Sequence, residues 1–118
     1  TMKVQDSEQA EFTARWNVIQ SAVHATAIDH GWWDGDAHND GEKVALIHSE
    51  LSEALEGFRE PGPSDKIPEF SKVEEEYADV VTRIMDHAAH IGADVVGAML
   101  AKMAYNRGRP HRHGGKRF

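Results

Sequence analysis

The sequence predicts an all-α protein, and three observations support that prediction. Apolar residues recur at the three- and four-residue spacing of an amphipathic helix in four separate segments. Glycine, proline and capping residues stand between those segments, where helices begin and end. No alternating segment bounded by hairpin turns occurs. Because a chain of 118 residues forms one domain with a single modest core, we expect one four-helix, bundle-like subunit over residues 2–118.

The first helix is expected over about residues 7–30, with Asp6 or Ser7 as its cap. It should end at Gly31, since glycine readily adopts the backbone conformation that closes a helix. Its apolar positions are Phe12, Trp16, Ile19, Val23 and Ala27.

Residues 32–41 are rich in glycine, aspartate and asparagine, so they are predicted to form a loop. The loop opens with Trp32 and Trp33. Two adjacent tryptophans cannot both face one core from an extended strand, because successive side chains point to opposite sides. At least one of the two is therefore expected to line a cleft or an interface.

The second helix should begin near Asp40 and run to about Arg59. Asn39 and Glu42 stand at the three-residue spacing of a capping box just before and inside its first turn. Three prolines within positions 61–68 then forbid a helix, because proline lacks the backbone N–H and clashes with the preceding turn.

The third helix is predicted to begin after Ser71, which forms a capping-box pattern with Glu74, and to end before Gly92. Asp94 can cap a fourth helix. The apolar residues on one side of that helix are Val96, Met99, Leu100 and Met103. Beyond it, residues 107–118 form a basic tail rich in glycine and histidine.

The second and third helices repeat one pattern at a shift of 26 residues. Glu50 and Glu53 align with Glu76 and Asp79. The aligned apolar stripes are Ile47, Leu51, Ala54 and Phe58 in one helix and Val73, Tyr77, Val80 and Ile84 in the other. At about 100° per residue, each acidic pair borders its apolar stripe instead of lying opposite to it.

Packing these two stripes together would bring four carboxylates close to one another. Such a group costs free energy unless a cation lies among the charges. Mg²⁺ and Mn²⁺ favour carboxylate and water oxygens, so Glu50, Glu53, Glu76 and Asp79 are predicted to bind Mg²⁺, for which Mn²⁺ can substitute. Glu75 lies close enough to support these ligands. The alternative is a solvated acidic face, since E-x-x-E spacing alone is common.

The net charge of −7 conceals a strong asymmetry. Residues 107–118 carry five basic residues and no acidic one, which leaves eight basic against twenty acidic residues in the rest of the chain. An acidic body repels nucleic acid, so polymeric DNA or RNA is not expected as a partner. A small polyphosphate held by a metal and by the basic tail remains compatible with this charge.

Other classes of site lack their signatures. The absence of cysteine excludes a disulfide framework, a thiol nucleophile and a cysteine zinc site. No glutamate has a histidine three residues later, as a ferritin-like di-iron site requires. His87 and His90 are interpreted as polar flanks of a helix. No P-loop, G-x-S-x-G or dinucleotide motif occurs, and no membrane-length apolar run or leader is found, so we expect a soluble, cytoplasmic protein without a membrane partner.

Lys102 and Asn106 lie one turn apart on the fourth helix, at the edge of its apolar stripe. A lysine there can contact phosphate and an amide can orient a sugar or phosphate oxygen, although an ordinary amphipathic flank has the same appearance. The motifs in order are Glu50-x-x-Glu53, Glu76-x-x-Asp79 and Lys102-x-x-x-Asn106. This order resembles the metal motif of the all-α nucleoside triphosphate pyrophosphohydrolases, the MazG-like and dUTPase/dCTPase-like group. The resemblance covers about residues 38–118, and the basic end is similar to that of short, single-domain bacterial or phage members.

The resemblance implies Mg²⁺-dependent hydrolysis of a nucleoside or deoxynucleoside triphosphate to the monophosphate and pyrophosphate, in a dimer or tetramer of helical bundles. Glu50, Glu53, Glu76 and Asp79 would hold metal, and Glu53 or Glu50 would accept a proton from the attacking water. The residues expected to contact phosphate and sugar are Lys102, Asn106, Arg109 and Lys116. Those expected to contact the base are Trp32, Trp33, His38 and Asn39.

Two further expectations follow from the residues. A base stacked on a tryptophan, with Asp34 or Asp36 accepting hydrogen bonds from it, would favour purine and in particular guanine. Wide apolar stripes leave more apolar surface than a small monomer can cover, so a homotetramer or homodimer is expected.

The alternative from another class is a non-catalytic helical binding or oligomerisation module, which would respond to neither metal nor nucleotide.

Overall fold

A computed structural model describes residues 2–35 and 38–109 of the chain. Within these ranges it contains four helices, α1 (Asp6–Asp29), α2 (Asp40–Arg59), α3 (Lys72–Ile91) and α4 (Val95–Arg107), and no strand. The all-α prediction is therefore confirmed. Asp36 and most of the basic tail, including Lys116, lie outside the described residues.

Three of the four helix starts are capped by the residues that the sequence indicates. The Asn39 Oδ1 accepts the backbone N–H groups of Gly41 and Glu42 at 2.7 and 3.2 Å. Ser71 and Glu74 form the reciprocal capping box that begins α3, with distances of 3.0 and 2.9 Å. The Asp94 Oδ1 caps α4 in the same way, accepting from the Gly97 N–H at 2.9 Å. Each bond satisfies a donor that the first turn of a helix would otherwise leave unpaired.

The start of α1 differs from the prediction. The residue before the helix is Gln5, whose backbone N–H donates to the Glu8 Oε1 at 3.1 Å. Asp6 lies inside the first turn, where its negative charge favours the positive end of the helix dipole. The assignment of Asp6 or Ser7 as the cap is therefore wrong, because acidic and polar residues are favourable on both sides of a helix start.

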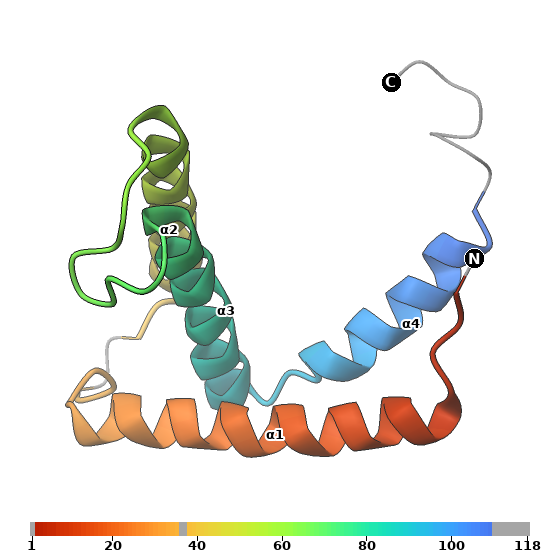
Figure 1. The fold of residues 1–118 in the computed structure, drawn as a ribbon. Coiled ribbons are helices and arrows are strands. Elements are labelled where there is room, and N and C mark those ends of the chain that lie inside the picture. The colour runs from red at the N-terminus through yellow and green to blue at the C-terminus, as the bar shows by residue number, and fades with distance from the viewer. Residues whose placement is uncertain (1, 36–37, 110–118) are drawn as a thin grey trace.

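The helices form a base with two arms (Figure 1). α1 is the base, and α2 and α3 pair into a hairpin that rises from one part of it. α3 also packs on α1, whereas α4 diverges from α3 and makes its main contact, a slight one, with α1. Gly92, with a φ of 70°, lies at the junction where the chain leaves α3 for α4. Such a left-handed conformation favours glycine.

The contact between α2 and α3 is close because the residues in it are small. Ala54 and Gly57 are the buried residues of α2. A Cβ atom at Gly57 would lie only 3.0 Å from the Val73 Cγ2 and 3.3 Å from the Val73 backbone nitrogen. The two helices therefore approach along a seam that leaves no room for a larger side chain at this position.

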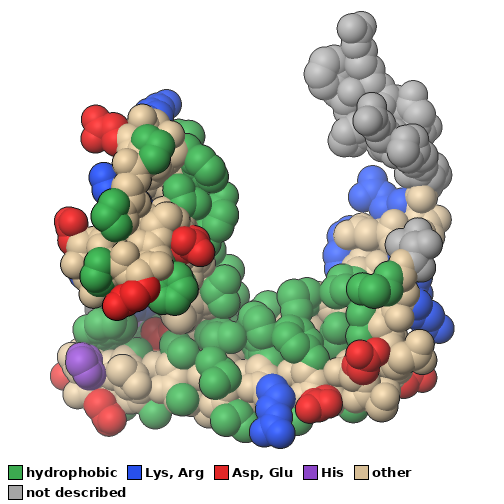
Figure 2. Space-filling view, viewed as in Figure 1, with side chains coloured by type: hydrophobic (Ala, Val, Ile, Leu, Met, Phe, Trp, Pro, Cys, Tyr) green, Lys and Arg blue, Asp and Glu red, His purple; other side chains and the backbone are tan. Residues whose placement is uncertain are grey.

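Most of the large apolar side chains lie outside this seam. The buried hydrophobic residues are Ala27, Ala54, Met85, Ala88 and Val96. Leu51, Phe58 and Tyr77, which the sequence pattern places in buried stripes, are 44%, 61% and 51% exposed in this subunit. The small-residue seam therefore covers only the edge of these stripes, and the large apolar side chains beyond it stay exposed within one subunit. Figure 2 shows hydrophobic side chains lining the hollow between the two arms.

Candidate metal centre

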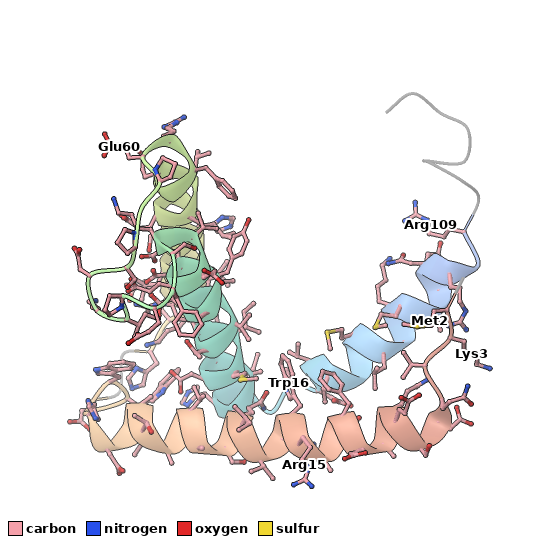
Figure 3. The ribbon with its side chains drawn as sticks, in the orientation of Figure 1. Met2, Lys3, Arg15, Trp16, Glu60 and Arg109 are labelled. Atoms are coloured by element: carbon pink, nitrogen blue, oxygen red, sulfur yellow. The ribbon has the colours of Figure 1, made fainter. Side chains whose placement is uncertain are left out.

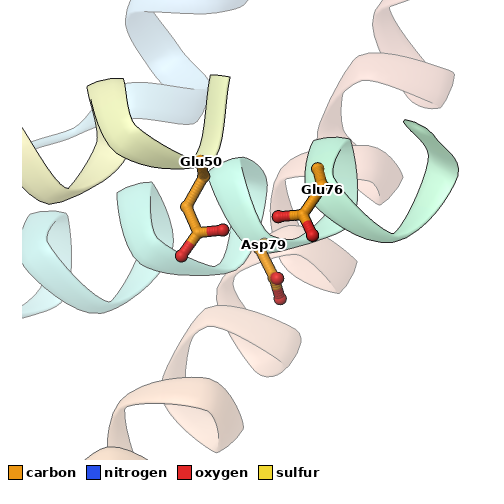
Figure 4. A group of neighbouring side chains, drawn as sticks. All are labelled: Glu50, Glu76 and Asp79. Carbon is orange, nitrogen blue, oxygen red and sulfur yellow. The ribbon is translucent and has the colours of Figure 1, made fainter. Parts of the chain in front are cut away.

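The seam between α2 and α3 brings three acidic side chains together. Glu50 reaches from α2 toward Glu76 and Asp79, which stand one turn apart on α3 (Figure 4). One carboxylate oxygen from each residue lies within 4.8 Å of the others. Three of the four carboxylates in the predicted set thus converge from two helices, at a spacing that one divalent cation can bridge.

Glu53 is not part of this group. It lies one turn beyond Glu50 on α2 and its side chain is exposed. The repeat of the two helices therefore places equivalent residues at equivalent angles without giving them equivalent neighbours. We call Glu50, Glu76 and Asp79 the acidic triad.

Glu76 has the most perturbed ionisation in the triad. A proton on Glu76 can be donated to Glu50, and burial and the charges of Glu50, Asp79 and Glu75 also disfavour the anion. Together they raise the pKa of Glu76 from 4.5 to about 7. Near neutral pH the residue is thus poised between its two forms.

Asp79 shares this electrostatic environment. Burial, followed by the charges of Glu50 and Glu75, raises the pKa of Asp79 above its ordinary value, and Arg83 and Lys66 oppose the shift. Glu75 is held in place by the buried Ser64, whose hydroxyl donates to the Glu75 Oε1. Glu75 therefore stands beside the triad as a fixed fourth negative charge.

The Oε2 atom of Glu76 is buried and has no hydrogen-bond partner among the described residues. A buried oxygen of this kind costs free energy unless a donor or a cation satisfies it. A bound divalent cation would satisfy it and would also lower the repulsion that raises the pKa values of Glu76 and Asp79. The oxygen-only donor set suits Mg²⁺ or Mn²⁺.

Arg83 is the one basic residue that contacts the triad within the described ranges. Its Nε donates to the Glu50 Oε1 at 2.9 Å. The sequence reasoning missed this residue, although it stands one turn after Asp79 on the same helix and its position was a usable signal. Arg83 both neutralises part of the triad's charge and presents a guanidinium group at its edge.

Arg83 also lines a cavity of 610 Å³ between α1, α2 and α3. Most of its wall is apolar, and the polar and aromatic side chains at its edge include Trp32, Lys43 and Asp86. A cavity of this size accommodates a small organic ligand. Because Arg83 belongs to both places, the cavity and the triad adjoin.

The two tryptophans of the loop have different surroundings. Trp33 stacks on the His90 ring at a centroid distance of 3.9 Å, and the Lys43 ammonium lies 4.1 Å from the Trp33 ring centroid. The Trp33 Nε1 donates to Asp86, which also pairs with the His24 Nδ1 at 2.7 Å. Trp32 is 61% exposed at the edge of the cavity. At least one tryptophan thus lines a cleft, as the sequence indicates.

The other two residues predicted to contact a base have local roles. His38 forms a hydrogen bond of 2.6 Å between its Nε2 and the Trp33 carbonyl oxygen, and Asn39 caps α2. His90, interpreted from sequence as a plain polar flank, is the stacking partner of Trp33. Its position one helical turn after Asp86 was the signal that could have linked it to the loop.

Lys102, Asn106 and Arg109, which are the predicted phosphate-contacting residues that the structure describes, lie on or just after α4 and apart from the triad. The Lys102 ammonium and the Arg109 guanidinium both lie over the Tyr105 ring, at 4.7 and 5.9 Å. Asn106 lines a smaller groove with Met2. Figure 3 shows Arg109 at the far end of α4, while Glu60 marks the tip of the other arm. The described subunit therefore brings none of the predicted phosphate ligands to its own triad.

Comparison of the chain with protein-family models, with curated proteins and with solved structures gives no match. Among the described helices, none has both the length and the apolar character needed to cross a membrane.

Proposed function

We propose that the chain is a Mg²⁺-dependent nucleoside triphosphate pyrophosphohydrolase of the all-α, MazG-like kind. The observation that supports this most directly is the acidic triad, in which Glu50, Glu76 and Asp79 converge and the buried Oε2 of Glu76 has no hydrogen-bond partner among the described residues. A purely solvated acidic face would keep its carboxylates apart and in water, because bringing like charges together raises their free energy.

In the proposed reaction, the acidic triad, Glu53 and Arg83 have different roles. Glu50, Glu76 and Asp79 hold the cation, which when bound supplies positive charge for the phosphate oxygens and favours ionisation of the attacking water. Glu53, exposed one turn from Glu50, accepts the proton of that water. Arg83 contacts phosphate oxygens at the edge of the triad and stabilises the negative charge that accumulates on the leaving pyrophosphate.

The cavity beside Arg83 takes the base and sugar of the nucleotide. Its volume of 610 Å³ and its apolar wall suit a heteroaromatic ring, on which the exposed Trp32 can stack. Asp86 is already engaged by His24 and Trp33, so it has little capacity left for the base. Asp34 is the exposed carboxylate nearest in sequence to Trp32 and would accept hydrogen bonds from guanine. Purine, and guanine in particular, is the proposed preference.

A screen of the common ribo- and deoxynucleoside triphosphates tests this function. The purified protein with Mg²⁺ should release pyrophosphate and the nucleoside monophosphate, and chelation of the metal should abolish the release. Release of inorganic phosphate as the first product would identify a different reaction, because cleavage would then fall between the β- and γ-phosphorus atoms.

Thermal melting separates this function from that of a binding module. A ligand that binds only the native state at one hundred times its Kd stabilises that state by about 2.7 kcal/mol. Mg²⁺ with a nucleotide should therefore raise the melting temperature. Identical melting curves with every metal and nucleotide combination would favour the non-catalytic module.

A further inference from the structure

The loop that joins α2 to α3, residues 60–71, folds back beside the hairpin (Figure 1) and is organised around one buried serine. Ser64 is 2% exposed. Its backbone N–H donates to the Phe70 carbonyl oxygen at 2.8 Å. Its hydroxyl oxygen accepts the backbone N–H groups of Lys66 and Ile67 at 3.2 and 3.1 Å. The conformation of the loop around Lys66 is therefore fixed by bonds that converge on one residue.

The Ser64 hydroxyl also joins the loop to the neighbourhood of the acidic triad. It donates to the Glu75 Oε1. Glu75 is adjacent in sequence to Glu76 and lies one turn before Asp79 on α3. The Lys66 backbone and the Glu75 carboxylate thus bond to the same hydroxyl group, so the loop holds Lys66 close to the triad.

The Lys66 side chain is an exposed cation beside this negative group. Among the described residues it forms no ion pair. Burial raises the pKa of Asp79 most, and within the described ranges the charges of Arg83 and Lys66 are the ones that lower it. The interaction of two charges falls with distance, so this effect agrees with a position near the triad. Lys66 therefore has a free ammonium group on a flexible stem close to the candidate metal centre.

Lys66 and Arg83 approach the triad from opposite ends of one face of α3. Glu75, Asp79 and Arg83 follow one another at four-residue intervals, so they fall within about 80° of arc. Glu75, which the loop contacts, lies about 6 Å before Asp79 along the helix axis, and Arg83 lies about 6 Å beyond it. Arg83 also lines the cavity. A ligand that extends from the cavity across the triad therefore continues toward the loop.

The geometry points to Lys66 as the residue that binds the γ-phosphate of the nucleotide, with Ser64 as the residue that positions it. The γ-phosphate assignment rests on the proposed function, in which the cavity takes the base and sugar and the cation at the triad takes the phosphate that is attacked. The triphosphate then runs along α3 toward the loop, and its last phosphate meets the Lys66 ammonium. A lysine suits this place, because it contacts phosphate as a point charge with three donors.

Binding of inorganic pyrophosphate with Mg²⁺, measured by isothermal titration calorimetry, tests this role without hydrolysis. Lys66→Gln removes a charge from an exposed side chain, so the fold should be retained and the Kd for pyrophosphate should rise by about 10-fold or more. Lys66→Arg keeps the charge and should retain most of the affinity.

Lys3→Gln is the matched control, because Lys3 is exposed at the end of the molecule away from the hairpin (Figure 3). It should bind pyrophosphate as the wild type does. Equal affinities in Lys66→Gln and Lys3→Gln would overturn the role of Lys66, as would a wild type that binds no pyrophosphate in the presence of Mg²⁺.

Nucleotides with the same base locate the contact along the triphosphate. In Lys66→Gln the KM for the nucleoside triphosphate should rise by about 10-fold or more, whereas the Kd for the nucleoside monophosphate should not change, because the monophosphate does not reach the loop. An equal loss of affinity for the monophosphate would overturn the γ-phosphate assignment.

Ser64→Ala tests the positioning role, with circular dichroism to show that the variant is folded. The Kd for pyrophosphate should rise in Ser64→Ala. If Ser64 acts through Lys66, the double variant Ser64→Ala/Lys66→Gln should bind pyrophosphate no more weakly than Lys66→Gln alone. Additive losses in the double variant would overturn the positioning role of Ser64. An unfolded Ser64→Ala would leave the decision on Lys66 to the variants of Lys66 itself.

The two kinds of measurement separate the role of Lys66 from the proposed function. If the wild type hydrolyses nucleotides and Lys66→Gln keeps the wild-type KM and Kd, the role of Lys66 fails and the proposed function stands. If the wild type hydrolyses no nucleotide, the proposed function and the γ-phosphate assignment fail together. Calorimetry with pyrophosphate then still decides whether Lys66 binds a phosphate anion.

Discussion

Glu76 is the residue of the candidate site whose ionisation depends most on its neighbours. Its carboxylate faces Glu50, has one buried oxygen without a hydrogen-bond partner among the described residues, and has a pKa raised to about 7. Glu50 meanwhile is shared between this group and the Arg83 guanidinium. A bound cation and Arg83 thus act on the same carboxylate, and single substitutions can separate their effects.

Removing one charge from the triad should abolish hydrolysis without unfolding the protein. Glu50→Gln and Asp79→Asn keep the shape of the side chain but weaken cation binding, so kcat/KM should fall by about 100-fold or more, equal to about 2.7 kcal/mol of transition-state stabilisation. The control is Glu56→Gln, since Glu56 is an exposed residue of α2 that pairs with Arg59 on the same helix. Substantial activity in both triad variants, measured as pyrophosphate release, would contradict the metal assignment.

The raised pKa of Glu76 makes the stability of the metal-free protein depend on pH. Between the unfolded pKa of about 4.5 and the folded pKa of about 7 the native state holds a proton that the unfolded state has lost. The unfolded state therefore binds fewer protons, and the free energy of unfolding should decrease as the pH rises through this window.

Denaturant titrations of the wild type and of Glu76→Gln across this window measure the effect. The glutamine variant should lose less stability with rising pH, and Mg²⁺ should reduce the difference, because a cation favours the ionised carboxylate. Parallel pH profiles for the two proteins in the absence of metal would show that Glu76 ionises normally.

At the scale of the elements, the seam between α2 and α3 positions the triad. Gly57→Val would drive a branched side chain against Val73, so it should destabilise the protein by about 1–3 kcal/mol and weaken Mg²⁺ binding at the same time. Ser52→Val, at an exposed position of α2, is the matched control for the effect of valine on the helix itself. Equal losses in the two variants, measured by urea unfolding, would show that the seam tolerates the side chain.

The helices could be predicted from sequence because their starts and stops are local. Asn39, Ser71 and Asp94 form bonds with backbone groups two or three residues away, so the sequence contains both partners. The predicted cap of α1 was wrong because three polar residues, Gln5, Asp6 and Ser7, lie within one turn and each can occupy the capping position. The exposure of Leu51 and Phe58 could not be predicted from their periodicity, since an apolar stripe does not specify what packs against it.

The candidate site could also be predicted only in part from the sequence. The repeat indicated Glu50, Glu76 and Asp79 because α2 and α3 pack side by side along one edge of their aligned stripes. It could not separate Glu53 from them, since the position of Glu53 relative to α3 depends on how the helices cross. Arg83 and His90 contact residues 33 and 57 positions away, so their places one turn after Asp79 and Asp86 indicate the side of α3 on which they lie but not the residues they contact.

At the scale of the whole molecule, the division of charge predicts a role for the basic tail, most of which lies outside the described residues. Deleting residues 110–118 removes three basic residues and should raise the KM for a triphosphate, with a smaller effect at high salt because exposed charges are screened beyond about 10 Å at 0.1 M. Steady-state kinetics at two salt concentrations measure this. Wild-type kinetics in the truncated protein would show that the tail takes no part in binding.

The bond between Arg83 and Glu50 also implies a sequence of events. The Arg83 Nε donates to the Glu50 Oε1, so one oxygen of the triad and one of the five N–H groups of Arg83 are already engaged. If a cation binds the triad as proposed, it would compete with Arg83 for Glu50 and would leave the Arg83 Nε free for an anion at the adjoining cavity. Metal and nucleotide would therefore bind in order, the metal first and the nucleotide second. The affinity for a nucleotide in the absence of metal should be low, and it should increase as the metal concentration rises.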